Sequence, residues 1–201
     1  MPKAVIFDYG VGNLMSLKTG LEKAGLDASV GTSAKDLACA DAIALPGVGA
    51  FTAAANKLNE VKETLTSKIQ EGTPLLGICL GLQLFFEQSE EGPGSGLGLF
   101  KGKVVQLPST VKVPHMGWNT LDIVKPNELF NDVPSGSYVY FVHSLYPSPT
   151  DKRIVCTTTE YGTTFTSAVA YKNVYGTQFH PEKSGNIGMQ ILKNFAKNVV
   201  R

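Results

Sequence analysis

Cys79 stands between two glycines in the stretch GICLG, residues 77–81, where an apolar run ends and a helical pattern begins. A sharp turn from a strand into a helix strains its central residue and requires small neighbours, as in the G-x-S-x-G turn that presents a serine nucleophile. The start of the helix stabilises negative charge and therefore favours the thiolate form of the cysteine. The N–H of Leu80 would point towards an oxyanion formed beside the sulfur. The stretch therefore predicts a nucleophilic cysteine.

A structural role is the alternative for any cysteine, because cysteine is among the residues most often buried in protein cores. Cys39 and Cys156 have no flanking glycines, and we expect both to be packing residues. The three cysteines have no C-x-x-C spacing and cannot all pair with one another. These features favour free thiols in a reducing cytoplasm.

A thiol nucleophile needs a base, and His180 is the best placed of the three histidines. It follows an apolar run in GTQFHPEKS, with Pro181 directly after it and Glu182 two positions on. A carboxylate on the second ring nitrogen would fix the tautomer of the imidazole and stabilise its charged form. Taken alone, His-Pro-Glu is also typical of a surface turn. A zinc site is a further alternative, but no pair of candidate ligands has zinc-site spacing, so we expect no metal.

The glycine-rich stretch LPGVGAF, residues 45–51, follows a predicted strand and is a candidate for a second oxyanion donor. Glycines let backbone N–H groups approach a ligand closely, and the N–H groups of Val48 and Gly49 are the candidates. An ordinary turn from a strand into a helix explains the same residues. The two interpretations are compatible.

Short apolar runs alternate with helical patterns in the first half of the chain, which predicts strands buried on both faces of a parallel sheet covered by helices. The expected strands and helices in this half are 4–7, 14–24, 42–45, 54–69, 74–78 and 80–88. The second half carries strand-like runs separated by turns, which we expect to extend the sheet as antiparallel hairpins before a final helix. The predicted fold class is α/β, a three-layer sandwich whose mostly parallel central sheet is extended by antiparallel strands.

Length and composition limit the number of domains, the class of protein and the kinds of partner. The 201 residues suit a single domain spanning 1–201, and a chain with 43% hydrophobic and 17% charged residues is ordinarily globular. Lys plus Arg number 18 and Asp plus Glu 17, a balance that argues against nucleic acid or an anionic membrane as the main partner. The longest apolar run, residues 75–86, is too short to span a bilayer, and the first residues read as a strand and not as a secretory signal.

The motifs PGVG, GICLGLQ and HPEKS stand in the order typical of the class I glutamine amidotransferases, and the chain resembles this family over its whole length. Within it, the chain is similar to the glutaminase subunits of imidazole glycerol phosphate synthase, which serve histidine biosynthesis. DYGVGN, PHMGWN, FVHS and the lysine after HPE carry this narrower resemblance. The glutaminase subunit of anthranilate synthase, which typically reads HPES, is the alternative, and PHMGWN argues against it.

The resemblance implies hydrolysis of glutamine to glutamate and ammonia by a triad of Cys79, His180 and Glu182, without a cofactor. The oxyanion would be held by the N–H of Leu80 together with that of Val48 or Gly49. A non-catalytic binding module on the same fold is the alternative, but such a module would be expected to lack a member of the triad.

The family pattern also assigns the binding of substrate glutamine to Gln83, Glu91, Ser144 and Leu145. By composition alone, Glu91 would instead belong to a solvated acidic patch, residues 87–91. Leu145 stands where tyrosine is common in the family, with Tyr146 one place later.

The resemblance further implies a partner, a (β/α)₈-barrel cyclase that uses the ammonia. A Trp and a Met in a polar loop are typical anchors of an interface. The resulting interface candidates are Asn13, Pro114, His115, Met116, Trp118 and Lys183. For Trp118 a buried position that closes a hairpin is the alternative.

Overall fold

A central sheet organises the chain in the computed structural model, which describes residues 1–10 and 14–199. Its strands run in the order β2 (Asp27–Gly31), β1 (Lys3–Phe7), β3 (Ala42–Leu45), β4 (Leu75–Ile78), β13 (Val174–Thr177), β12 (Thr164–Tyr171), β11 (Val155–Glu160) and β8 (Asp122–Ile123). The pairs from β2 to β13 are parallel and those from β13 to β8 are antiparallel. Among the described residues, no helix is long and apolar enough to cross a membrane.

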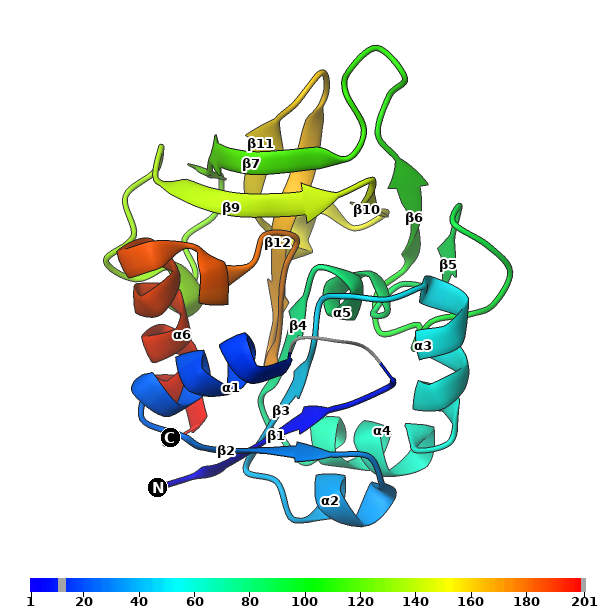
Figure 1. Cartoon of the computed structure of the whole chain (residues 1–201), viewed down its shortest axis with the longest axis vertical. Helices are drawn as coiled ribbons and strands as arrows, with labels where there is room; N and C mark the ends of the chain where they lie inside the picture. The colour runs from blue at the N-terminus through cyan, green and yellow to red at the C-terminus, as the bar shows by residue number, and fades with distance from the viewer. Residues whose placement is uncertain (11–13, 200–201) are drawn as a thin grey trace.

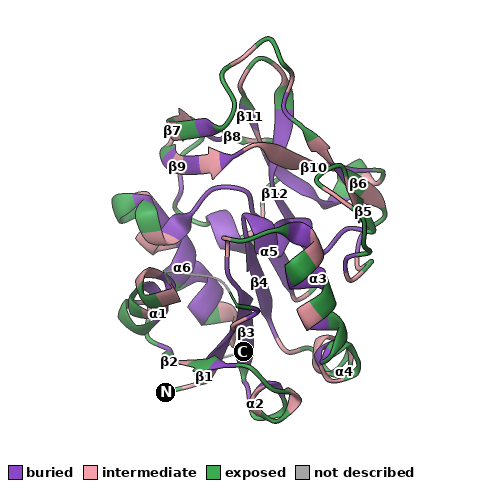
Figure 2. Ribbon diagram, turned by 45° about the vertical axis from the view of Figure 1, so that its right-hand side comes forward, coloured by how far each residue is buried: buried purple, intermediate pink, exposed green. Residues whose placement is uncertain are grey.

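Helices cover both faces of this sheet (Figure 1). One face carries α1 (Leu14–Lys23) and α6 (Gly185–Val199), and the other carries α2 (Ala34–Ala38), α3 (Phe51–Asn59) and α4 (Lys62–Gln70). Because successive strand residues point to opposite faces, Ala4 and Ile6 pack in the core under α1 and α6, while Val5 and Phe7 pack in the core under α3 and α4. Both faces of the parallel strands are therefore buried, as Figure 2 shows, and the predicted three-layer α/β fold is confirmed.

The second half of the chain divides its strands among three sheets. β11, β12 and β8 extend the central sheet as expected, but β13 joins its parallel part. β6 (Gly102–Gln106) pairs with β5 (Gln88–Ser89) and β10 (Leu145–Pro149), and β7 (His115–Thr120) pairs with β9 (Tyr138–His143). The expectation that all these strands extend the central sheet is therefore wrong. The chain changes sheet at Ser144, between β9 and β10, where the Ser144 carbonyl accepts from the N–H of Leu107 at 2.9 Å.

Two helices differ from their predicted lengths. The helix expected over 54–69 is broken at residues 60–61 into α3 and α4, although neither Gly nor Pro lies at the break; both Val61 and Leu65 remain buried. The helix after Cys79, expected to reach about residue 88, is only α5 (Leu80–Gln83). The N–H groups of Phe85 and Phe86 bond to carbonyls three residues back, and this tighter turn buries both rings in the core. Three short 3₁₀ helices complete the elements: η1 (Glu128–Phe130), η2 (Lys152–Ile154) and η3 (Pro181–Lys183).

Candidate active site

Cys79 occupies the strained turn that the sequence predicts. It lies between β4 and α5 with φ 48° and ψ −101°, a left-handed backbone that non-glycine residues rarely adopt. A Cβ on Gly77 would lie 2.7 Å from the Gly81 backbone, and a Cβ on Gly81 would lie 2.2 Å from the carbonyl oxygen of Leu45. The two glycines are therefore required because the turn presses against itself and against the end of β3.

Sheet topology brings His180 to this turn. β13 lies parallel to β4 with Thr177 opposite Ile78, and the N–H of Cys79 donates to the carbonyl of Thr177 at 2.7 Å. The residues that follow β13 must therefore pass beside the cysteine. Nδ1 of His180 lies 2.8 Å from Oε1 of Glu182, and both side chains are almost fully buried.

The charge of His180 depends on these neighbours. Burial alone disfavours the imidazolium, but the attraction of the Cys79 sulfur and the hydrogen bond and charge of Glu182 outweigh it and raise the pKa of His180 from 6.5 to about 10. Its Nε2 is buried and has no hydrogen-bond partner among the described residues. The sulfur of Cys79 is therefore an electrostatic neighbour of Nε2 and not a partner in a formed hydrogen bond, which leaves Nε2 open to a leaving group.

Gly47 separates the cysteine from the histidine. A Cβ at this position would lie 2.7 Å from Cε1 of His180 and 3.1 Å from Cβ of Cys79. The predicted oxyanion donors Val48 and Gly49 follow directly, and Gly49 has a φ of 119° that favours glycine. The sequence predicted that glycines in this stretch allow backbone N–H groups to approach a ligand closely. It did not indicate that Gly47 makes room for the side chains of both Cys79 and His180.

Tyr9, two residues after the end of β1, holds the start of the same glycine-rich stretch. Its buried hydroxyl donates to the carbonyl of Pro46. Burial, followed by the charges of Cys79 and Asp8, raises the pKa of Tyr9 well above its usual value, so the phenol remains a neutral donor. No local pattern indicated this contact, because the two residues are 37 positions apart in the sequence.

The predicted substrate residues lie in two places. Gln83 is buried at the end of α5, where its Nε2 donates to the carbonyl of Leu145 at 3.1 Å. That carbonyl also faces Nδ1 of His143 at 2.8 Å, so both of its lone pairs are occupied. Glu91 is exposed and accepts from the N–H of Phe51 at 3.0 Å, which ties it to the start of α3. Binding of glutamine by these residues and by Ser144 remains a prediction.

Gln178 is a buried polar residue that the sequence reasoning passed over. Its Nε2 lies 3.3 Å from Sγ of Cys79, and its Oε1 lies 3.2 Å from Nε2 of Gln83. The residue stands within GTQFHPEKS, two positions before His180. An amide in a run that is otherwise apolar was the signal that could have identified it.

The predicted interface residues divide into exposed and buried ones. Met116 and Trp118 lie on the same face of β7 and are 63% and 55% exposed, so the alternative of a buried Trp118 is wrong. Pro114 and Lys183 are also exposed. His115 points the other way and is buried, so its side chain is not available to a partner. Asn13 lies outside the described residues.

His115 belongs to a second group of buried histidines. Its Nδ1 lies 3.0 Å from Nε2 of His143, and its Nε2 lies 3.3 Å from Nδ2 of Asn119. Burial lowers the pKa of His115 to about 4, and burial outweighs a hydrogen bond to Leu145 to lower that of His143 to about 3. Both rings are therefore neutral at neutral pH.

The other two cysteines differ from each other. Cys156 is buried as expected, and burial raises its pKa to about 11. Cys39 is exposed at the end of α2, so its predicted packing role is wrong. Within residues 1–10 and 14–199, no three His, Cys, Asp or Glu side chains are grouped so that they could hold a metal ion.

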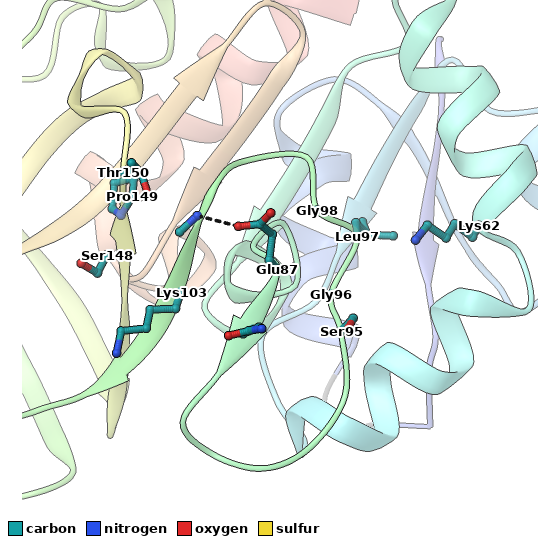
Figure 3. Close-up of a pocket in the computed structure, with 12 residues that line it drawn as sticks. Lys62, Glu87, Ser95, Gly96, Leu97, Gly98, Lys103, Ser148, Pro149 and Thr150 are labelled. Carbon is teal, nitrogen blue, oxygen red and sulfur yellow. Dashed lines mark hydrogen bonds between the residues drawn. The ribbon is translucent and has the colours of Figure 1, made fainter.

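A surface hollow of about 780 Å³ lies among the 95–98 loop, β6 and β10, away from the cysteine (Figure 3). Its carboxylate, that of Glu87, accepts from the N–H of Gly102 at 3.1 Å, and Lys103 at its edge is paired with Glu90. No member of the Cys79–His180–Glu182 group lines it. Because the residues that line this hollow include no Cys or His that could act as a nucleophile or base, the buried cysteine centre is the better candidate site.

Comparisons with known proteins identify the family of the whole chain. The family model for glutamine amidotransferase class-I matches residues 5–199. The chain is 47% identical to the imidazole glycerol phosphate synthase subunit HisH of Methanothermobacter thermautotrophicus, with 96% of each chain covered. It is 48% identical to the subunit of the same name from Syntrophotalea carbinolica, covering 95% of this chain and 98% of the other. A solved structure described as glutamine amidotransferase shares the fold, with a TM-score of 0.77, 15% identity and coverage of 98% of this chain and 99% of that chain. The resemblance inferred from the motifs is thus confirmed, and the chain belongs to the class I glutamine amidotransferases, in the family of the imidazole glycerol phosphate synthase subunits HisH.

Proposed function

We propose that this chain is the glutaminase subunit of an imidazole glycerol phosphate synthase in histidine biosynthesis. It hydrolyses glutamine to glutamate and ammonia and passes the ammonia to a cyclase. The observation that carries the proposal is the strained turn at Cys79 beside the buried pair of His180 and Glu182. A nucleophile, a base and a group that orients the base are the parts that amide hydrolysis by a thiol requires.

The reaction proceeds in two halves. The Cys79 thiolate attacks the side-chain amide carbon of glutamine, the C–N bond breaks, and His180 gives its Nε2 proton to the departing ammonia. His180 then removes a proton from water, which attacks the thioester and releases glutamate and the thiolate. Glu182 holds Nδ1 of the imidazole throughout, so that the same ring nitrogen serves both halves.

Backbone donors stabilise the oxyanion in both halves. The N–H of Leu80 comes from the first turn of α5, where helix N–H groups have no partner within the helix. The second donor is the N–H of Val48 or Gly49, held beside the pair by Gly47 and by the contact between Tyr9 and Pro46. Loss of one such donor typically slows the reaction by about a hundred- to a thousand-fold.

Substrate glutamine is held beside these groups by Gln83, Glu91 and the segment of Ser144 and Leu145. Because the Leu145 carbonyl already accepts from Gln83 and faces His143, other groups of that segment would contact the substrate. The exposed carboxylate of Glu91, at the start of α3, suits the α-ammonium group of the substrate.

The partner is a (β/α)₈-barrel cyclase that docks on β7. Met116 and Trp118 form the exposed apolar anchors, with Pro114 and Lys183 at the edge. Trp118 pairs with Tyr140 of β9, and the carbonyl of Tyr140 accepts from the N–H of His180 at 2.9 Å. Docking at Trp118 is therefore one strand away from the catalytic base.

Partner binding also has a physical task. Cys79 and His180 are buried, and the cavity that Gly47, Val48 and His180 help to line is only about 10 Å³. The isolated chain should therefore hydrolyse glutamine slowly, and a liganded cyclase should favour the arrangement that admits substrate and presents the second oxyanion N–H. We further propose that residues 1–201 act as one domain in the cytoplasm, where the three thiols would remain free.

The test is the glutaminase rate of the isolated chain, of its complex with a cyclase subunit, and of that complex with cyclase ligand. We expect the liganded complex to be about a hundred-fold faster than the isolated chain or more, as formation of an oxyanion donor would allow. Trp118→Ala should weaken docking and activation. Tyr171→Ala is the matched control, since Tyr171 is equally exposed but lies at the end of β12 in the central sheet, and not in the sheet of β7 and β9.

Two results would contradict the proposal. If Cys79→Ala retained the activity of the liganded complex, the nucleophile would be wrong. If the isolated chain already ran at the liganded rate, coupling to a cyclase would be wrong.

A further inference from the structure

A chain of amides connects the nucleophile to the segment after β9. Gln178 is fully buried, and its side chain lies between Sγ of Cys79 and the amide of Gln83. Gln83 in turn contacts the carbonyl of Leu145. The contacts of Gln178 at both ends are buried, so its polar atoms must be satisfied by these neighbours.

The backbone carbonyl of Leu145 determines the direction of every bond in this chain. A carbonyl oxygen only accepts, so the group of Gln83 that faces it at 3.1 Å must be the NH₂. The same nitrogen is 3.2 Å from the Gln178 amide, which must therefore present its oxygen there. The NH₂ group of Gln178 is then the group that faces Sγ of Cys79 at 3.3 Å.

The sulfur consequently has neighbours that favour opposite forms. The carbonyl of Val142, at 3.7 Å, can accept only from a protonated thiol and repels a thiolate. The Gln178 N–H can donate to a thiolate, and a donor to an ionised acceptor makes a stronger hydrogen bond than one between neutral groups. Gln178 therefore offsets the carbonyl of Val142.

We propose that Gln178 is a positioning residue of the glutaminase reaction, whose side-chain N–H stabilises the Cys79 thiolate and holds the sulfur at the turn. The inference rests on the proposed function, in which Cys79 is the nucleophile. Gln83 acts through Gln178, because it holds the Gln178 amide in the orientation that points the NH₂ group at sulfur.

The test is the pH profile of alkylation of Cys79 by iodoacetamide, followed by mass spectrometry of the Cys79 peptide so that Cys39 and Cys156 do not interfere. Gln178→Met keeps the length of the side chain and removes the donor. We expect the midpoint of the profile to move to higher pH by about one unit or more, which corresponds to the loss of one hydrogen bond to a charged group. Gln83→Met should move the midpoint in the same direction by less.

Other titratable groups lie around the sulfur, and none of them is substituted in these variants. They are His180 and Glu182 after β13, Tyr9 after β1 and His143 on β9. A second readout is steady-state kinetics in the cyclase complex, where Gln178→Met should lower kcat by about ten-fold or more and change KM little, because the thiolate reacts after substrate is bound.

Asn194→Leu is the matched control, since Asn194 is also a buried amide and donates to the carbonyls of Leu129 and Asn131 away from the site. It should lower stability without moving the Cys79 midpoint. If Gln178→Met does not fold, Gln178→Leu tests the same loss of a donor. An unchanged midpoint in a folded Gln178 variant would reduce Gln178 to a packing residue, even if Cys79→Ala is inactive; activity in Cys79→Ala would instead remove the proposed function.

Discussion

Two regions of this chain bury histidines almost equally, but one holds a charged histidine and the other holds two neutral ones. His180 is 1% exposed, and His115 and His143 are 4% and 5% exposed. The pKa of His180 is raised, whereas those of His115 and His143 are lowered. Burial opposes the charged form in both regions, so the difference comes from the partners. The carboxylate of Glu182 and the sulfur of Cys79 favour the charged form of His180, whereas the hydrogen-bond partners of the other two are neutral groups, and the charge of His180 further lowers the pKa of His143.

The positions of the protons on the two neutral histidines follow from the same carbonyl that orients the amides of Gln83 and Gln178. The carbonyl of Leu145 can only accept, so Nδ1 of His143 carries the proton and its Nε2 accepts from Nδ1 of His115. Nε2 of His115 is then left to accept from Asn119. This group supports the same Leu145 carbonyl that accepts from Gln83. A histidine in the core is therefore not evidence of catalysis unless an acidic partner accompanies it.

Among the substitutions considered for the charged region, His180→Asn should cause the largest loss of glutaminase activity. Because this change removes the base that handles the proton in both halves of the reaction, we expect kcat in the liganded complex to fall by about 10⁵-fold or more. Glu182→Gln keeps the base and loses only its orienting charge, so its loss should be smaller by one to two orders of magnitude. Steady-state glutaminase assays on folded variants, checked by circular dichroism, measure both. Equal losses would mean that Glu182 does more than hold the imidazole.

The same contrast extends to the cysteines. Burial of Cys156 outweighs the charge of Lys125, and the resulting pKa of about 11 leaves about one molecule in a thousand as thiolate at pH 8. We expect an electrophilic glutamine analogue to label Cys79 at least about a thousand-fold faster than Cys156 at that pH. Peptide mass spectrometry after timed labelling gives the ratio, and Cys39, which is exposed, serves as the internal reference. Comparable labelling of Cys79 and Cys156 would argue against an activated nucleophile.

The two neutral histidines should make the protein less stable at acid pH. In the unfolded chain His115 and His143 take up protons near pH 6.5, but in the folded chain only near pH 4 and pH 3. Between these values the unfolded state binds more protons, so the free energy of unfolding falls as pH falls, by up to about 2 kcal/mol for each histidine from pH 6.5 to pH 5. Urea unfolding at pH 7 and pH 5 measures this loss.

The double variant His115→Gln/His143→Gln should flatten that pH dependence even if it is less stable throughout. Asn194→Leu, which removes a buried amide but no titrating group, should keep the slope of the original chain. An unchanged slope in the double variant would show that neither histidine stays neutral in the folded protein. His180 changes in the opposite sense: its raised pKa contributes stability that is fully present below pH 6.5 and is lost as pH rises towards about 10.

Local sequence signals determined much of the fold and the centre of the site. Continuous apolar runs located β1, β3 and β4, because strands buried on both faces leave no polar positions. The glycines around Cys79 indicated the strained turn, and the spacing of His180 and Glu182 indicated an adjacent base and carboxylate. Each of these signals acts over a few residues, which is why sequence alone could identify them.

Only the tertiary structure decided which residues meet across the chain. The register of β4 against β13 brings Gln178 and His180 to Cys79, about a hundred residues away, and this register depends on which strands pair. The contact between Tyr9 and Pro46 and the fit of Gly47 against His180 depend on the same order of strands. Whether His115 faces a partner or the core likewise followed from its pairing with β9 and from packing on Tyr161 and Phe141. Residue type states what a side chain can do, but its charge and its partners depend on neighbours that only the folded chain supplies.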